Sequence, residues 1–251
     1  MIIRKSPKDI EKMKIAGRVC YDVFEAVEEK IKPGMSTLDV DKICEEICRG
    51  EGAKPAFKGL YGFPGSACIS VNDEVIHGIP SGEKILKEGD IVSVDFGAYK
   101  NGFAGDSTRT YIVGGKTSKI ARDLVRVTRE ALYAGIDMCV PGNRLGDVGY
   151  AIQSYCESRG FSVVKEYVGH GIGKSVHEDP NVPNYGIKGK GLRLTEGMAL
   201  AIEPMINAGK ADIEILPDKW TVVTADGSLS AHWEHTVVIT ADGPIITTDK
   251  N

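Results

Sequence analysis

The chain repeats a sequence pattern at a fixed distance, and this repeat limits its possible folds more than any other feature. Residues 33–52 (PGMSTLDVDKICEEICRGEG) and 141–160 (PGNRLGDVGYAIQSYCESRG) share six identities at an offset of 108. The same offset aligns LKEGDIVSVD, which ends at Asp95, with LTEGMALAIE, which ends at Glu203. A second, independent segment at the same offset indicates duplication. Two copies of one unit are therefore expected, approximately over residues 1–115 and 116–251.

Each copy begins with helical patterns and continues with short runs rich in β-branched residues. Helices are expected over residues 10–31, 40–48, 120–134 and 145–156, and strands over residues 67–71, 91–96, 108–113, 198–202 and 236–239. Ser36 or Thr37 should cap the second helix, and Thr117 the third. Helices before strands in each copy predict an α+β fold, in which antiparallel strands of the two copies meet and the helices pack outside. No linker divides the chain, so a single domain over residues 1–251 is expected.

Composition excludes several classes of protein. With 251 residues and 42% apolar content, the chain can bury a substantial core. Its net charge of −4, from 31 basic and 35 acidic residues, gives no support for a nucleic-acid or membrane-surface partner. No apolar run approaches the length of a membrane span, and the first residues lack the apolar core of a secretory signal. A cytoplasmic protein without disulfides is therefore expected, with most of its six cysteines buried as small apolar residues.

Two aspartates lie in a predicted hairpin, where acidic side chains are uncommon. Asn101-Gly102 is a strong signal for a two-residue turn, because both central positions of a type I′ turn need positive φ. This turn places Asp95 opposite Thr108 and Asp106 opposite Gly97, so all four share one face of the sheet. The two aspartates are then diagonal neighbours, roughly 7–8 Å apart at the backbone. In an isolated hairpin one aspartate would more simply serve the turn and the other face solvent.

The second copy makes that simpler interpretation less favourable. It supplies Glu203 at the position equivalent to Asp95, and Glu234 in a second acid-x-Thr motif that resembles the one at Asp106. Four carboxylates converging on one centre repel one another unless a multivalent cation lies between them. His170, in the glycine-rich motif GHGIG, is the candidate fifth ligand.

Other chemistries fit the sequence poorly. GGKTS, at residues 114–118, lacks the first glycine of a phosphate-binding loop, and neither a G-x-S-x-G nor an H-E-x-x-H motif is present. A cysteine nucleophile at Cys68 is conceivable, but no activating Cys-His arrangement accompanies it. His232 and His235, which flank Glu234, are expected to support the site or to serve the structure.

Asp95, Asp106, His170, Glu203 and Glu234, within VDFGA, GDSTRT, GHGIG, IEPM and WEHT, closely resemble the five metal ligands of the methionine aminopeptidases. The resemblance extends to IEKMKIAGR, KPGMST, SVNDEVIHGIP and DGSLSAHWEHT, and therefore covers nearly the whole chain. It implies the pita-bread fold, with two pseudo-symmetric halves, a central antiparallel sheet and outer helices. Only 31 residues separate Glu203 from Glu234, which leaves no room for the helical insertion of the type II enzymes. A bacterial or organellar type I enzyme without an N-terminal extension is expected.

The resemblance also implies a reaction: hydrolytic removal of the N-terminal methionine from peptides and from nascent chains at the ribosome, with a small second residue favoured. Two divalent ions (cobalt, manganese, iron or zinc) would hold a hydroxide that attacks the scissile carbonyl. By resemblance, Asp106 and Glu234 bridge the ions, Asp95 completes one site, and His170 with Glu203 completes the other. Glu203 would also carry a proton to the leaving amine. His177 would stabilise the oxyanion, and His77 would contact the substrate backbone.

The methionine pocket implied by the resemblance departs from the better-known family members. Its residues would be Phe57, Leu60, Phe63, Cys68, His77, Val176 and Trp220. Leu60 and Val176 stand where familiar bacterial enzymes carry aromatic rings, and Phe57 stands where a cysteine is common. Methionine specificity with altered inhibitor or side-chain preference is therefore expected. The resemblance also suggests a sodium or potassium ion near Asn72, Glu74 and Ser230.

Two alternatives remain open. Prolidases and aminopeptidase P share the fold and similar ligands but cut before proline, usually with an extra N-terminal domain. Some pita-bread relatives have lost catalysis and bind nucleic acid or histones, although all five ligands are present here and no basic patch is visible. A monomeric enzyme without nucleic-acid or membrane partners is the favoured interpretation.

Overall fold

The computed structural model describes residues 2–250, and its long helices lie where the apolar spacing predicted them. They are α1 (Pro7–Lys30), α2 (Thr37–Gly50), α3 (Lys119–Ile136) and α4 (Leu145–Glu157). Ser36 caps α2 as predicted, but the predicted Thr117 cap of α3 was wrong. Ser118 takes that role, because its side chain accepts the Ala121 N–H, whereas Thr117 Oγ1 donates to the Gly89 carbonyl. Within residues 2–250, no helix is long and apolar enough to cross a membrane.

A nine-stranded sheet forms the centre of the protein. Its main path runs β1-β4-β5-β14-β9-β7-β8, with β2 added beside β4 and β15 beside β14. The strands are β1 (Lys54–Pro55), β2 (Cys68–Val71), β4 (Ile91–Lys100), β5 (Phe103–Ile112), β7 (Gly169–Gly171), β8 (Glu178–Val182), β9 (Ala199–Ile202), β14 (Glu234–Thr240) and β15 (Gly243–Ile246). The strands of the two proposed copies meet where β5 pairs antiparallel with β14, as predicted.

The hairpin of β4 and β5 has the predicted register. Asn101 and Gly102 both have positive φ, at 53° and 79°. Asp95 pairs with Thr108 and Gly97 pairs with Asp106. Because successive side chains alternate between the faces of a strand, both aspartates lie on one face. The sequence prediction of the hairpin is therefore confirmed.

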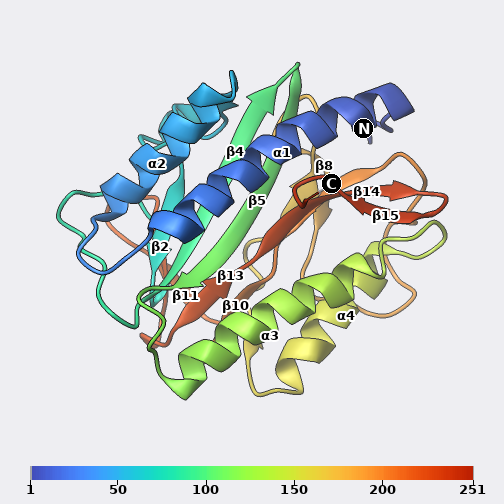
Figure 1. Cartoon of the computed structure of the whole chain (residues 1–251). Coiled ribbons are helices and arrows are strands. Elements are labelled where there is room, and N and C mark those ends of the chain that lie inside the picture. Colours follow the sequence, from blue (N-terminus) through green and yellow to red (C-terminus); the bar gives the residue numbers. More distant parts are fainter. Residues whose placement is uncertain (1, 251) are drawn as a thin grey trace.

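The helices cover one face of this sheet, and α1 follows the β4–β5 hairpin (Figure 1). One apolar cluster joins α1 and α2 to β2 and β4, and another joins α3 and α4 to β9 and β14. The contact of α1 with β5 is unusually close, because a Cβ added to Gly105 would lie 2.7 Å from the Gly17 nitrogen. Gly105 thus faces α1, and its neighbour Asp106 points to the opposite face.

Two small sheets and a short helix complete the wall around that opposite face. One sheet has the order β13-β10-β6 and the other β11-β12-β3. Their strands are β3 (Glu74–Ile76), β6 (Ser162–Val163), β10 (Met205–Asn207), β11 (Ile213–Ile215), β12 (Val222–Thr224) and β13 (Ser230–His232). The 3-10 helix η1 (Leu60–Gly62) lies in the segment between β1 and β2.

Candidate metal centre and active site

A cavity of about 270 Å³ brings together all five expected metal ligands. They come from β4, β5, β7, the segment after β9, and the start of β14. The cavity is lined by Phe57, Leu60, Tyr61, Phe63, Cys68, Ile76, His77, Asp95, Asp106, Tyr167, Val168, His170, His177, Glu203, Trp220 and Glu234. One end of the cavity is therefore acidic and the other largely apolar.

Hydroxyl groups between β5 and β14 fix Asp106 relative to Glu234. Thr236 Oγ1 accepts the Asp106 N–H at 3.1 Å and donates to the Asp106 carbonyl at 2.8 Å. Ser107 Oγ donates to the Glu234 carbonyl at 2.6 Å, and Thr108 Oγ1 donates to Glu234 Oε2 at 3.0 Å. The acid-x-Thr motifs thus provide cross-strand bonds, a role that the sequence analysis did not assign to them.

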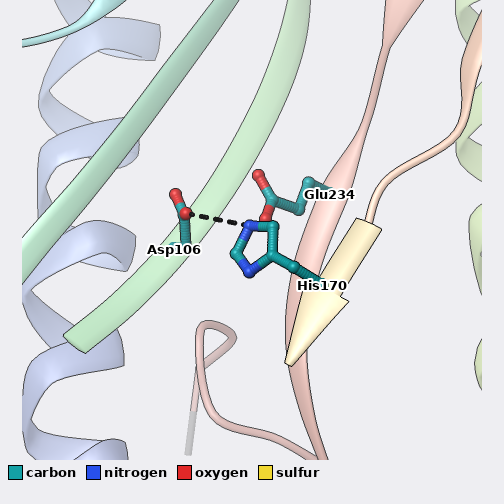
Figure 2. A group of neighbouring side chains, drawn as sticks. All are labelled: Asp106, His170 and Glu234. Carbon is teal, nitrogen blue, oxygen red and sulfur yellow. Dashed lines mark ion pairs between the residues drawn. The ribbon is translucent and has the colours of Figure 1, made fainter. Parts of the chain in front are cut away.

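Asp106, His170 and Glu234 converge from three strands (Figure 2). One ligand atom from each lies within 4.8 Å of the other two. His170 Nε2 is 3.7 Å from Asp106 Oδ2 and 3.5 Å from Glu203 Oε1. His170 Nδ1 is 2.9 Å from the Gly171 carbonyl oxygen. Because a carbonyl oxygen can only accept, Nδ1 carries the proton, and Nε2 of the neutral ring presents a lone pair to the carboxylates.

Burial shifts the titration of the whole cluster. It raises the pKa of Asp95, Asp106, Glu203 and Glu234 above the ordinary carboxyl range, and repulsion between the carboxylates raises the pKa of the last three further. Burial also lowers the pKa of His170 to about 4, so this imidazole is neutral near pH 7. Within residues 2–250, no Lys or Arg forms an ion pair with these four acids. The cluster therefore lacks a compensating positive charge of its own.

Buried oxygens in the cluster also lack hydrogen-bond donors. Asp95 Oδ1, Asp106 Oδ1 and Glu234 Oε1 have no hydrogen-bond partner among the residues that the structure describes. Buried polar atoms of this kind are costly unless a ligand, water or ion satisfies them. Contacts of 3.5–3.7 Å are too long for hydrogen bonds but suit ligands around one cation with bonds of about 2 Å. The residues present thus fit divalent ions, and four carboxylates with one imidazole form an oxygen-rich site.

The remaining histidines lie at different sides of the cluster. The His177 ring packs edge to face on His170, with 4.5 Å between centroids. His77 has a positive φ of 58° and contacts the rings of Tyr167 and Trp220. Burial lowers the pKa of His177 and lowers that of His77 to about 4, so both rings are neutral near pH 7.

The histidines on either side of Glu234 lie in different sheets and have different partners. His232 Nε2 lies 3.7 Å from Glu203 Oε2. His235 instead hydrogen-bonds with Tyr133 and Thr248, away from the acidic cluster. Of the two, His232 thus lies beside the acidic cluster, a difference that periodicity alone could not show.

The apolar end of the cavity contains most of the expected methionine pocket. Phe63 and Trp220 pack edge to face, with 5.1 Å between centroids, and Phe57, Leu60 and Cys68 complete this wall. Val176, expected in the same wall, does not line the cavity. Its side chain packs in the same apolar cluster as Phe57 and Phe63, and its N–H donates to Tyr99 Oη.

Four residues that line the cavity were not predicted from the sequence: Tyr61, Ile76, Tyr167 and Val168. Ile76 and Val168 each lie within two residues of an expected histidine, so the motifs VIHGIP and GHGIG offered a local signal. Tyr61 lies between two glycines in GLYGF, a pattern that indicates a tight turn but not where the ring points.

The expected monovalent-cation residues are neighbours, but one already has a cationic partner. The Ser230 N–H donates to the Asn72 carbonyl at 2.8 Å. The Glu74 carboxylate accepts the Val71 N–H and forms an ion pair with Lys84. A sodium or potassium ion at this place stays a prediction.

Comparison with known proteins identifies the family of the chain. Residues 11–241 match the model of metallopeptidase family M24. The chain is 52% identical to a methionine aminopeptidase of Clostridium perfringens, over 99% of each chain, and 51% identical to methionine aminopeptidase 1 of Bacillus subtilis, over 97% of each.

Solved structures show the same relationship. The crystal structure of a methionine aminopeptidase from Thermotoga maritima matches with a TM-score of 0.97 at 50% identity, over the full length of both chains. A prolidase from Pyrococcus furiosus matches with a TM-score of 0.78 at 25% identity, over 99% of this chain and 66% of its own. The arrangement of sheet and helices is therefore the pita-bread fold. The chain belongs to metallopeptidase family M24, within which it groups with the methionine aminopeptidases.

Proposed function

We propose that the protein hydrolyses the bond after an N-terminal methionine, with a preference for a small second residue. This proposal rests on one observation: a cluster of four acids and a histidine adjoins an apolar pocket within the same cavity. The acidic end suits metal-assisted hydrolysis, and the apolar end suits a flexible thioether side chain.

Asp95, Asp106, His170, Glu203 and Glu234 would hold two divalent ions. When bound, such ions polarise a carbonyl group and lower the pKa of water toward neutrality. By resemblance to the methionine aminopeptidases, Asp106 and Glu234, which converge with His170, would hold both ions. The choice among cobalt, manganese, iron and zinc would follow availability in the cell, because the donor set accepts several of these metals.

Glu203 is proposed to move the proton during hydrolysis. Its carboxylate lies between His170 and His232, at 3.5 and 3.7 Å, and burial raises its pKa. A carboxylate with a raised pKa can accept a proton from the attacking water and release it to the amine of the leaving peptide. Asn184 Nδ2 donates to the Glu203 carbonyl at 3.0 Å, which fixes the backbone of this residue.

His177 and His77 are proposed to orient the substrate. Each ring is neutral near pH 7 and can donate one N–H, to the oxygen that becomes negative (His177) or to the substrate backbone (His77). Trp220 and Phe63 would contact the methionine side chain and exclude water from that end. Because Leu60 and Phe57 lie in the same wall, we propose that the preference for inhibitors and for side chains similar to methionine differs from that of the better-known family members.

In the cell, we propose that the protein acts in the cytoplasm as a monomer on chains that emerge from the ribosome. This proposal rests on the substrate: an exposed N-terminal methionine is present on every newly started chain. It requires no membrane or nucleic-acid contact.

Release of methionine from tripeptides tests the activity. The manganese-loaded or cobalt-loaded protein should cleave Met-Ala-Ser and norleucine-Ala-Ser much faster than Leu-Ala-Ser, and should leave Gly-Pro and Xaa-Pro substrates intact. Glu203→Gln should lower kcat by about a hundredfold or more, because general acid–base groups contribute on that scale. Equal rates on Leu-Ala-Ser would refute methionine specificity, and selective cleavage before proline would favour the prolidase alternative.

A further inference from the structure

Tyr61 combines an unusual backbone with an unusually exposed ring. Its φ and ψ are 52° and 17°, in the left-handed region that bulky residues rarely adopt. Gly59, two residues before it, and Gly62, directly after it, also have positive φ. Residues held in such conformations cluster at binding sites, where the surrounding structure fixes them.

Hydrogen bonds within the turn hold Tyr61 in place. The Gly59 N–H donates to the Phe63 carbonyl at 2.9 Å, and the Phe63 N–H donates to the Leu60 carbonyl at 2.9 Å. The same short turn directs Leu60 and Phe63 into the cavity. The position of the Tyr61 ring is thus tied to the wall of the methionine pocket.

The ring stands at the mouth of the cavity, beside the proposed oxyanion group. It stacks on the His177 ring, with 6.1 Å between centroids and 14° between planes. Tyr61 also lines the cavity, yet it is 77% exposed. A large part of its aromatic surface is therefore free to be covered by a ligand.

Under the proposed function, we expect a substrate whose first side chain fills the apolar end to extend toward solvent past this exposed ring. His177 lies near the scissile bond under the proposed function, so the residues after that bond pass on its outer side, where Tyr61 stacks. Within residues 2–250, Tyr61 forms no ion pair or hydrogen bond with another side chain. Its contribution to binding is therefore an apolar ring face.

We propose that Tyr61 is a specificity-determining residue that binds the side chain of the third substrate residue and favours aromatic or large apolar groups there. This inference rests on the proposed function, because it concerns the leaving part of the same substrate. An aromatic pair at this exposed position should raise kcat/KM by about fivefold. The gain should appear in KM, because the contact does not change during the chemical step.

Steady-state kinetics on Met-Ala-Phe and Met-Ala-Gly test the inference. The wild-type protein should favour Met-Ala-Phe by about fivefold in kcat/KM. Tyr61→Phe should keep this preference, because it keeps the ring. Tyr61→Gly should lower kcat/KM for Met-Ala-Phe about fivefold more than kcat/KM for Met-Ala-Gly, so that the preference disappears. Tyr150→Ala, which removes another exposed tyrosine from α4, should change none of these values.

Thermal unfolding separates binding from a structural role. Glycine adopts positive φ without strain, so Tyr61→Gly should unfold at the same temperature as wild type or slightly higher. Equal loss of activity on both tripeptides in Tyr61→Gly, or an unchanged preference, would overturn the inference. If the wild type cleaves both tripeptides without preference, only the inference fails. If it cleaves neither, the proposed function fails and the inference falls with it.

Discussion

A buried ion pair joins the N-terminal segment to the loop that carries His177, and its removal should destabilise the protein measurably. Lys5 Nζ lies 2.7 Å from Glu178 Oε2, and the two side chains are only 4% and 10% exposed. Lys5 also donates to the Ile3 carbonyl, and Glu178 Oε1 accepts the N–H groups of Lys174 and Ser175. The ion pair and these hydrogen bonds therefore hold the residues on both sides of His177 in place.

Lys5→Met would leave the Glu178 carboxylate buried without its cation. Loss of one partner of a buried ion pair costs about 3–5 kcal/mol, and the two remaining N–H donors place this case near the lower value, about 3 kcal/mol. For a chain of this size, that corresponds to a decrease in Tm of about 6–12 °C. The double variant Lys5→Met/Glu178→Gln should lose only about 1 kcal/mol, because no buried charge remains.

Urea unfolding of metal-stripped protein gives these free energies without contributions from ion binding. Lys14→Met is the matched control, because Lys14 pairs with Glu11 at 2.8 Å on the surface and should contribute less than about 1 kcal/mol. In the metal-loaded protein, Lys5→Met should lower kcat through displacement of His177 while inhibition by free methionine stays unchanged. A loss below 1 kcal/mol in Lys5→Met, or a double variant that loses the sum of both single variants, would refute this account of the pair.

Three further predictions concern the site and its support. Burial raises the pKa of Asp95 from 3.8 to about 7, so this group contributes stability to metal-stripped protein that is lost as the pH rises across that window. The buried histidines, with lowered pKa values, have the opposite effect below about pH 6.5, so the Asp95 contribution is measured as the difference between wild type and Asp95→Asn in urea unfolding across pH 4–8. The wild type should lose stability relative to Asp95→Asn as the pH rises, and an unchanged difference would contradict the shift. Thr108→Val removes the donor to Glu234 Oε2 and should weaken metal binding by about 10- to 100-fold, as titration calorimetry can show, with unchanged affinity arguing against this role. Gly105→Ala should lower the free energy of unfolding, measured in urea, by about 3 kcal/mol, because the new Cβ would lie 2.7 Å from the Gly17 nitrogen. An unchanged free energy of unfolding would show that α1 can move away from β5.

Much of the fold could be predicted because its signals are local. Asn101-Gly102 specifies a two-residue turn, and that turn alone determines which residues of β4 and β5 face each other. Apolar spacing located the helices, since each buries one side against the sheet. The meeting of antiparallel strands from the two proposed copies was also predicted, and it occurs where β5 pairs with β14.

The rest depends on contacts between segments far apart in the chain. Val176 lies behind the pocket wall because the loop before β8 is held by Tyr99, which sequence spacing does not reveal. Tyr61 lines the cavity because a hydrogen bond between Gly59 and Phe63 closes a tight turn around it. The approach of His232 to Glu203 likewise requires β13 to leave the line of β14. Side-chain direction at such turns is decided by tertiary packing rather than by local pattern.

Anomalous diffraction from crystals grown with manganese tests the central claim most directly, namely that the hairpin and the duplicated half form one dinuclear site. The account predicts two anomalous peaks about 3.5–4 Å apart, both in contact with Asp106 and Glu234, with Asp95 on one ion and His170 and Glu203 on the other. Crystals of Asp106→Ala grown in the same way should lose at least one peak. Wild-type crystals without a peak between Asp106 and Glu234, and with their carboxylates joined by hydrogen bonds instead, would contradict the account.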